Sequence, residues 1–192
     1  MVDMITVGIV GYGKMGQLRH ERVNASSRGQ VVAVSDPFSN SLDVDDGIFV
    51  HDEWESLVSD PNIDAIFIAT ANAYSKPITI AALQSGKHVF CEKPPALTGN
   101  DMVEITGTEL ATKRKLMYGF NHRLHGAVKH MRKIVDSNHF GRVLWMRGRY
   151  GKSVDADFLK SWRADKSLSG GGILIDQGIH MLDLFLYLGG GF

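Results

Sequence analysis

The chain has 192 residues, with 21 basic and 21 acidic side chains, and is 44% hydrophobic. This composition is typical of a globular protein, and the zero formal net charge gives no reason to expect nucleic acid or a membrane as a partner. No apolar run is long enough to cross a bilayer, and the first residues, Met1-Val2-Asp3-Met4, lead into a strand without a secretory leader. A lone cysteine, Cys91, excludes an internal disulfide, so we expect a cytoplasmic protein.

The first predicted elements are a strand over Ile5–Val10 and a helix over Lys14–Asn24, joined by a turn with G-x-G-x-x-G spacing. Such a turn brings a dinucleotide pyrophosphate to the free N–H groups at the start of the helix. The same spacing also occurs in simple strand-to-helix connections, so the following elements must decide between the two interpretations. The candidate cofactor-binding residues of the turn are Gly11, Tyr12, Gly13, Lys14, Met15 and Gly16.

A second predicted strand, 31–35, ends in Asp36, about twenty residues after Gly16. An acid at this distance is expected to bind the adenosine ribose hydroxyls. Its charge would repel the 2′-phosphate of NADP, and residues 37–40 provide no Arg or Lys to offset it, so the pattern favours NAD. The alternative is an Asp that starts a turn with Pro37.

The elements that follow continue the alternation of strand and helix that is typical of a parallel sheet. The strand at 65–69 is apolar throughout, as expected for a strand covered on both faces. We therefore predict one nucleotide-binding Rossmann domain over residues 1–121. Its further elements are an irregular stretch over 43–47, helices over 53–58, 77–85 and 101–112, and strands over 65–69, 87–91 and 116–120.

Residues 122–192 are predicted to begin a second domain. A helix over Gly126–Asp136 precedes a strand over 142–150, whose alternating side chains indicate a sheet with two dissimilar faces. A loop, a triple glycine at 170–172 and an apolar helix follow. One strand does not make a stable sheet, and the last helix lacks a sheet to cover it, so we expect the N-terminal portion of a longer protein.

Four motifs together resemble the glucose–fructose oxidoreductase, inositol dehydrogenase and rhizopine catabolism (Gfo/Idh/MocA) family. They are G-Y-G-K-M-G at 11–16, A-T-A-N at 69–72, G-K-H-V-F-C-E-K-P at 86–94 and G-G-G-I-L-I-D-Q-G-I-H at 170–180. The resemblance covers nearly the whole chain. It implies an α/β fold in which the Rossmann domain is followed by an incomplete α+β domain with a mostly antiparallel open sheet. That second domain would bind substrate and form a homo-oligomer.

The resemblance also implies the catalytic residues. Lys93 matches the lysine between nicotinamide and substrate, and Glu92 matches a residue lining the cofactor site. His180 matches the histidine that exchanges the alcohol proton, and Asp176 matches its companion, four residues earlier on a predicted helix. Taken alone, E-K-P is typical of a solvated strand end and D-x-x-x-H of a helix-surface pair. In many members of the family the bond before Pro94 is cis.

Two positions of the A-T-A-N motif, Thr70 and Asn72, resemble a family T-P-N cofactor contact at the carboxyl end of a strand. Here Ala71 replaces the usual proline and Ser75 a frequent histidine, which puts the detailed geometry near the nicotinamide in question.

Arg123 follows the strand at 116–120, where the family presents polar groups, and is a candidate for a substrate hydroxyl or phosphate; a solvated turn is the alternative. Trp162 and Arg163 resemble a pair near the family's cofactor. The remaining histidines lack metal-ligand spacing, so no metal is expected.

The expected function is an NAD-dependent oxidoreductase that transfers hydride between a secondary alcohol of a sugar, cyclitol or nucleotide-linked sugar and nicotinamide. The alternatives are an NAD-dependent glycosidase, which would regenerate its cofactor, and a non-catalytic dinucleotide sensor or interaction subunit.

Overall fold

A computed structural model of the chain describes residues 4–37, 44–151, 153–154 and 156–190. The chain divides into two compact units, Met1–Gly119 and Phe120–Phe192, and each is described by itself. Among the described residues, no helix is both long enough and apolar enough to span a membrane.

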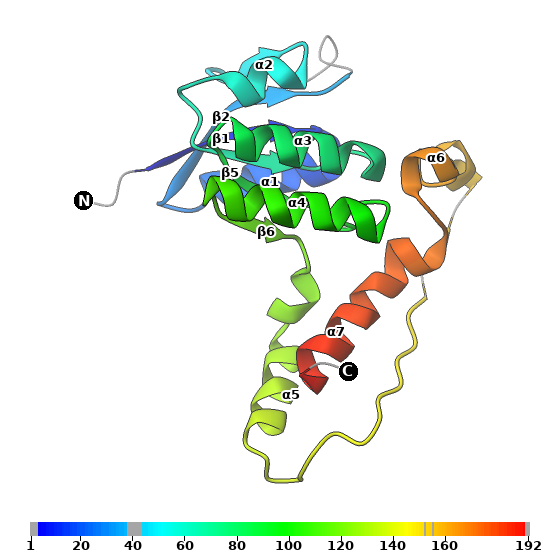
Figure 1. Ribbon diagram of the computed structural model, residues 1–192. Coiled ribbons are helices and arrows are strands. Elements are labelled where there is room, and N and C mark those ends of the chain that lie inside the picture. The colour runs from blue at the N-terminus through cyan, green and yellow to red at the C-terminus, as the bar shows by residue number, and fades with distance from the viewer. Residues whose placement is uncertain (1–3, 38–43, 152, 155, 191–192) are drawn as a thin grey trace. The chain divides into compact units, whose positions relative to one another are not determined.

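The first unit is built on a six-stranded sheet in the order β3-β2-β1-β4-β5-β6, and every pairing is parallel (Figure 1). The order reverses between β1 and β4, which is the topological switch point at which such sheets bind ligands. The strands are β1 (Ile5–Val10), β2 (Gly29–Ser35), β3 (Phe49–His51), β4 (Ala65–Ile68), β5 (His88–Cys91) and β6 (Leu116–Tyr118). The helices are α1 (Lys14–Asn24), α2 (Trp54–Ser59), α3 (Asn72–Gln84) and α4 (Gly99–Thr112).

Apolar side chains cover both faces of this sheet, because successive residues of a strand point to opposite sides. On one face, Ile66 and Ile68 of β4 pack with Leu83 of α3 and with residues of α2. On the other face, Ile9 of β1 packs in a cluster against which Val23 of α1 lies. The sheet is therefore enclosed by helices on both sides, and the carboxyl ends of its strands carry the predicted site.

Apart from shifts of one or two residues at the ends of elements, two details of the first unit differ from the sequence prediction. The strand β3 (Phe49–His51) was not predicted, since three residues give too short a period to detect. The helix α3 begins at Asn72, earlier than the predicted start at Pro77, which lies inside it. Proline is most common in the first helical turn, and that preference placed the predicted boundary too late.

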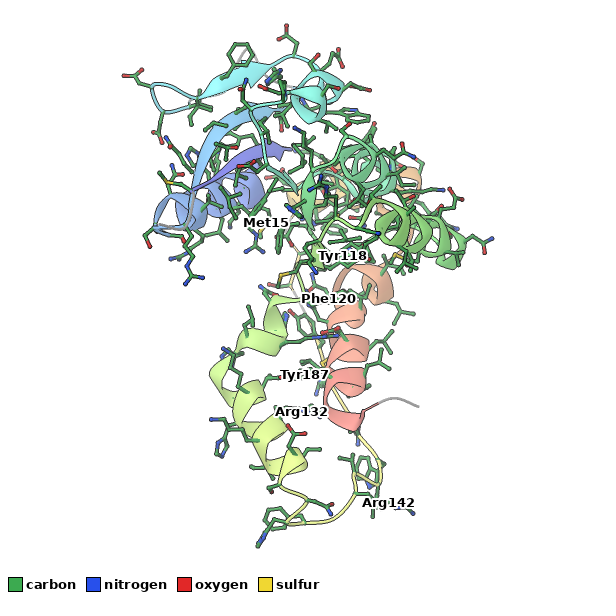
Figure 2. All side chains as sticks on the ribbon, turned by 60° about the vertical axis from the view of Figure 1, so that its left-hand side comes forward. Met15, Tyr118, Phe120, Arg132, Arg142 and Tyr187 are labelled. Atoms are coloured by element: carbon green, nitrogen blue, oxygen red, sulfur yellow. The ribbon has the colours of Figure 1, made fainter. Side chains whose placement is uncertain are left out.

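The second unit is helical in the part that the structure describes. It contains the 3₁₀-helices η2 (Asn121–Leu124) and η3 (Ala156–Lys160), the α-helices α5 (Gly126–Asp136), α6 (Lys166–Ser169) and α7 (Ile179–Gly189), and the π-helix η4 (Leu174–Gly178). Arg132 of α5 donates a hydrogen bond to the carbonyl oxygen of Tyr187 in α7, and its guanidinium lies 5.5 Å from the Tyr187 ring centre (Figure 2).

The predicted strand over 142–150 and the predicted antiparallel open sheet are wrong for this chain. Residues 142–150 form an extended coil without a ladder partner, and no described residue beyond Gly119 is in a strand (Figure 1). A strand needs a neighbouring strand for its backbone hydrogen bonds. This segment instead packs on α7: a Cβ added to Gly148 would collide with Met181 and lie 3.1 Å from Cζ of Phe185.

Candidate functional site

The glycine-rich turn between β1 and α1 uses its three glycines differently. Gly11 has a φ of +86°, and a Cβ there would lie 2.7 Å from the backbone of Ala69. A Cβ on Gly16 would collide with the carbonyl oxygen of Gly11. Gly13, by contrast, has extended backbone, and a Cβ there would meet no atom within 4 Å. The fold therefore requires Gly11 and Gly16, whereas Gly13 leaves open space at the N-terminus of α1, where a phosphate would fit.

The carboxylate of Asp36 is fixed beside this turn. Its Oδ2 accepts a hydrogen bond from the backbone N–H of Tyr12 at 2.7 Å. The Tyr12 hydroxyl in turn pairs with Nδ1 of the buried His20, whose Nε2 lies 2.8 Å from Nδ2 of Asn24. Oδ1 of Asn24 accepts the N–H of Val31 at 2.9 Å. A polar network thus links the turn, α1 and β2. The expectation that NAD is preferred to NADP rested partly on residues 38–40, which lie outside the described residues.

The residues that follow β4 and β5 lie at the same edge of the sheet, since the carboxyl ends of parallel strands meet there. The Thr70 hydroxyl donates to the carbonyl oxygen of Ala71 at 3.2 Å, and Asn72 is buried at the start of α3. Ala71 has a φ of −61°, a value that proline would impose, so the replacement keeps the backbone conformation there. The peptide bond between Lys93 and Pro94 is cis.

Glu92 makes an ion pair with Arg19 of α1, a residue that sequence reasoning missed. The Arg19 Nε donates to Oε1 of Glu92 at 2.7 Å, and a second guanidinium nitrogen pairs with the same oxygen. The guanidinium carbon also lies 4.8 Å from the ring centre of Phe90. The two partners are 73 positions apart in the chain, so spacing offered no signal for this pair.

The predicted pair of Asp176 and His180 lies in the second unit, where η4 passes into α7. Asp176 belongs to the π-helical turn and accepts a hydrogen bond from Nε2 of Gln177 at 2.9 Å. His180 is buried, in the first turn of α7. The π-helical turn contains more residues than an α-helical turn, so the one-face geometry expected for an α-helix does not apply unchanged. Such turns are frequent at functional sites.

Aromatic side chains surround His180 within the second unit. The ring centres of His122, Tyr150 and Phe120 lie 4.0, 6.2 and 6.3 Å from that of His180. The Tyr150 hydroxyl lies 3.3 Å from Nε2 of His122. Sequence reasoning missed both His122 and Tyr150 as neighbours of His180, although it singled out Arg123, the residue next to His122. We call the rings of His122, Tyr150 and His180 the histidine cluster.

Arg123 pairs with the buried Asp183 of α7. Its Nε donates to Oδ2 of Asp183 at 2.8 Å, and its guanidinium lies 5.3 Å from the ring centre of Tyr187. The hydrogen bond to Asp183 raises the pKa of Arg123, so the guanidinium remains charged. Arg123 therefore has a structural partner, which the sequence did not indicate. The guanidinium of Arg163 lies 4.4 Å from the ring centre of its neighbour Trp162.

Each unit thus contains some of the predicted site residues. The first brings the glycine-rich turn, Asp36 and the residues that follow β4 and β5 to one edge of a sheet, and the second contains Asp176 and the histidine cluster. Among the residues that the structure describes, no three His, Cys, Asp or Glu side chains gather as metal ligands would. The first unit has the parts of a dinucleotide site: the switch point, a glycine turn with open space, and a fixed acid.

Comparison with known proteins agrees with this geometry. Residues 5–122 match the family model of oxidoreductases with an NAD-binding Rossmann fold, and residues 128–192 match the Gfo/Idh/MocA C-terminal domain. The levoglucosan dehydrogenase of Pseudarthrobacter phenanthrenivorans is 37% identical over 142 residues, which are 73% of this chain and 36% of that protein.

Solved structures show the same likeness. The myo-inositol 2-dehydrogenase of Lactobacillus plantarum superposes with a TM-score of 0.84 at 29% identity, over 98% of this chain and 57% of that one. A levoglucosan dehydrogenase in complex with NADH gives a TM-score of 0.84 at 28% identity, over 97% of this chain and 54% of that one. The chain spans between 36% and 57% of the length of these three relatives. On the two family matches, the chain belongs to the Gfo/Idh/MocA family of oxidoreductases, with an NAD-binding Rossmann fold.

Proposed function

We propose that the protein is an NAD-dependent oxidoreductase that transfers hydride between a secondary alcohol of a sugar, cyclitol or nucleotide-linked sugar and nicotinamide. The observation that carries this proposal is the glycine turn: open space at Gly13 adjoins an acid, Asp36, that is held by the N–H of Tyr12 at 2.7 Å. The names of the relatives, a levoglucosan and a myo-inositol dehydrogenase, support the substrate class.

In the proposed cofactor site, the glycine turn (Gly11 to Gly16) and the N–H groups of α1 bind the pyrophosphate, and the Asp36 carboxylate accepts the ribose hydroxyls. A negative charge at Asp36 disfavours a 2′-phosphate, so NAD is preferred to NADP. Thr70, Asn72 and Glu92 contribute from the ends of β4 and β5, and Trp162 and Arg163 are further cofactor contacts in this proposal. When bound, NAD supplies the carbon that accepts or returns hydride.

The chain's own side chains then move the proton. His180 accepts the alcohol proton during oxidation and returns it during reduction, because imidazole changes its charge near neutral pH. The Lys93 ammonium orients the reacting oxygen and stabilises negative charge that develops on it. Asp176 binds a substrate hydroxyl beside His180, and Arg123 is a further substrate contact in this proposal.

We also propose that residues 1–121 form the cofactor domain and that residues 122–192 begin the substrate domain. The match of this region to the family's C-terminal domain supports our further proposal that copies of the protein associate through it.

Incubation of the protein with NAD and a panel of cyclitols, free sugars and nucleotide sugars tests the proposal. We expect reduced nicotinamide to accumulate only with substrate, and this signal to disappear in Lys93→Ala and His180→Asn. The matched control is His130→Asn, an exposed histidine of α5. Release of a leaving alcohol without accumulation of reduced nicotinamide would instead indicate a glycosidase. Cofactor binding without any turnover of a broad panel, both by this chain and by a version extended to the natural stop codon, would indicate a non-catalytic protein.

A further inference from the structure

The ion pair between Arg19 and Glu92 joins α1 to the carboxyl end of β5. Both side chains are largely buried, with 19% of Arg19 and 14% of Glu92 exposed. Two guanidinium nitrogens contact one carboxylate oxygen, and the guanidinium packs over the Phe90 ring. Water screens charge only weakly in such partly buried surroundings. Groups near Glu92 would therefore experience its negative charge if Arg19 did not offset it.

The position of Glu92 is fixed from several sides. Its backbone N–H donates to the carbonyl oxygen of Ile68 at 2.9 Å. Its carboxylate lies against Gly119, where an added Cβ would be 2.6 Å from Oε2 and 3.0 Å from Cδ. The absence of a side chain at Gly119 therefore makes room for the carboxylate. Glu92 cannot readily turn away from Arg19 in this arrangement.

The topology indicates which part of a dinucleotide Glu92 would face. A Rossmann sheet has two mononucleotide-binding halves, one on each side of the switch point. Here the first half is β1, β2 and β3, and it carries Asp36 for the adenosine ribose. The second half, β4, β5 and β6, is left for the nicotinamide, and Glu92 directly follows β5.

The nicotinamide ring is positively charged when oxidised and neutral when reduced. A carboxylate near the ring without a cationic partner would stabilise the oxidised cofactor selectively, and an unpaired guanidinium would do the opposite. We propose that the Arg19–Glu92 ion pair balances these two effects and so sets the relative affinity of the protein for oxidised and reduced NAD. This inference rests on the proposed cofactor site, and it assigns a role in cofactor binding to Arg19.

The test is the ratio of the dissociation constants of NADH and NAD⁺, measured with the full chain by calorimetry for wild type, Arg19→Met, Glu92→Gln and the double variant. Arg19→Met leaves the carboxylate unpaired, so NAD⁺ gains relative to NADH and the ratio rises about threefold or more. Glu92→Gln leaves the guanidinium unpaired, so the ratio falls by a similar factor. In the double variant the ratio returns close to the wild-type value.

A purely structural role of the pair would weaken the binding of both cofactors together and leave their ratio unchanged. The matched control is Lys76→Met, which removes a cation from the ion pair with Asp101 between α3 and α4 and leaves the ratio at the wild-type value. If Arg19→Met does not fold, Glu92→Gln still tests the proposal, because the proposal requires the ratio of the NADH to the NAD⁺ dissociation constant to fall in that variant.

Two results contradict different claims. Binding of both cofactors with an unchanged ratio in Arg19→Met and Glu92→Gln would overturn the role of the ion pair and leave the proposed cofactor site intact. A folded wild-type chain that binds neither NAD⁺ nor NADH would overturn the proposed cofactor site, and the role of the ion pair with it.

Discussion

The imidazole rings of His122 and His180 lie with their centres 4.0 Å apart and their planes tilted by 51°. Nε2 of His122 is 3.3 Å from the Tyr150 hydroxyl, and the Tyr150 ring is stacked at 6.2 Å from His180. His180 is thus enclosed by two rings that limit how its own ring can rotate. A general base must keep its nitrogen in line with the proton that it accepts, so this packing supports the role proposed for His180.

Replacement of His180 by Asn should lower kcat by a factor of about 10²–10⁴, the usual contribution of a general acid or base. Binding of NAD⁺ should remain, because the proposed cofactor residues are unchanged. Steady-state kinetics beside a calorimetric titration checks both statements. A variant with wild-type kcat would remove His180 from the mechanism.

His122→Ala should lower kcat about tenfold or more, because the loss of the neighbouring ring leaves the His180 imidazole less well oriented. His122→Phe keeps an aromatic ring at this position and should recover part of the lost rate. The comparison of kcat and KM in the two variants is the measurement. Equal activity of His122→Ala and wild type would show that the ring contact has no part in positioning His180.

The glycines of the turn should separate folding from binding. Gly13→Ala should change the free energy of unfolding by less than about 0.5 kcal/mol, since its Cβ meets open space. The same variant should bind NAD⁺ more weakly, because the methyl group occupies the place of a phosphate. Gly16→Ala should destabilise the fold by about 1–3 kcal/mol through its collision with the Gly11 carbonyl oxygen. Denaturant unfolding and calorimetry measure the two effects. The prediction fails if Gly13→Ala binds NAD⁺ as wild type does.

Asp36→Ser should raise the dissociation constant of NAD⁺ about tenfold, because hydrogen bonds from the ribose hydroxyls to a charged acceptor are lost. It should also lower the ratio of the NADP⁺ dissociation constant to the NAD⁺ dissociation constant, since the carboxylate no longer repels the 2′-phosphate. Asp46→Ser, at an exposed position, is the control. An unchanged ratio of the two affinities would contradict the assignment of Asp36.

Cys91 should be unreactive in the folded protein. It is fully buried, and burial raises the pKa of its thiol to about 12, so very little thiolate exists near neutral pH. Iodoacetamide should therefore label the native protein slowly and the urea-unfolded protein rapidly, as read by mass spectrometry, with Cys91→Ala as the unlabelled control. Fast labelling of the native protein would indicate that the end of β5 is open to solvent.

Local patterns predicted the parts of the molecule that local interactions determine. The bounds of β1, α1 and α5 agree with the sequence prediction, because a strand, a glycine turn and a helical period are encoded in neighbouring residues. The strand predicted over 142–150 is wrong because alternation describes a strand's two faces and says nothing about a partner for its hydrogen bonds.

Contacts between distant segments could not be predicted in this way. The Arg19–Glu92 pair spans 73 positions and the Arg123–Asp183 pair 60 positions, so no motif contains both partners. The network from Asp36 through Tyr12 to His20 also depends on the turn of the chain between β1 and α1. The sequence indicated Asp36 as a cofactor residue, and the structure adds the donor that fixes its carboxylate.

The most direct test of the proposed cofactor site is a calorimetric titration of this chain with NAD⁺, alongside Gly13→Ala. The glycine turn, Asp36 and the carboxyl ends of β4 and β5 all lie in the first unit, so the chain should bind NAD⁺ with a stoichiometry near one, and Gly13→Ala should bind it more weakly. A folded chain that produces no binding heat with NAD⁺, and no protection against thermal unfolding by it, would contradict the account.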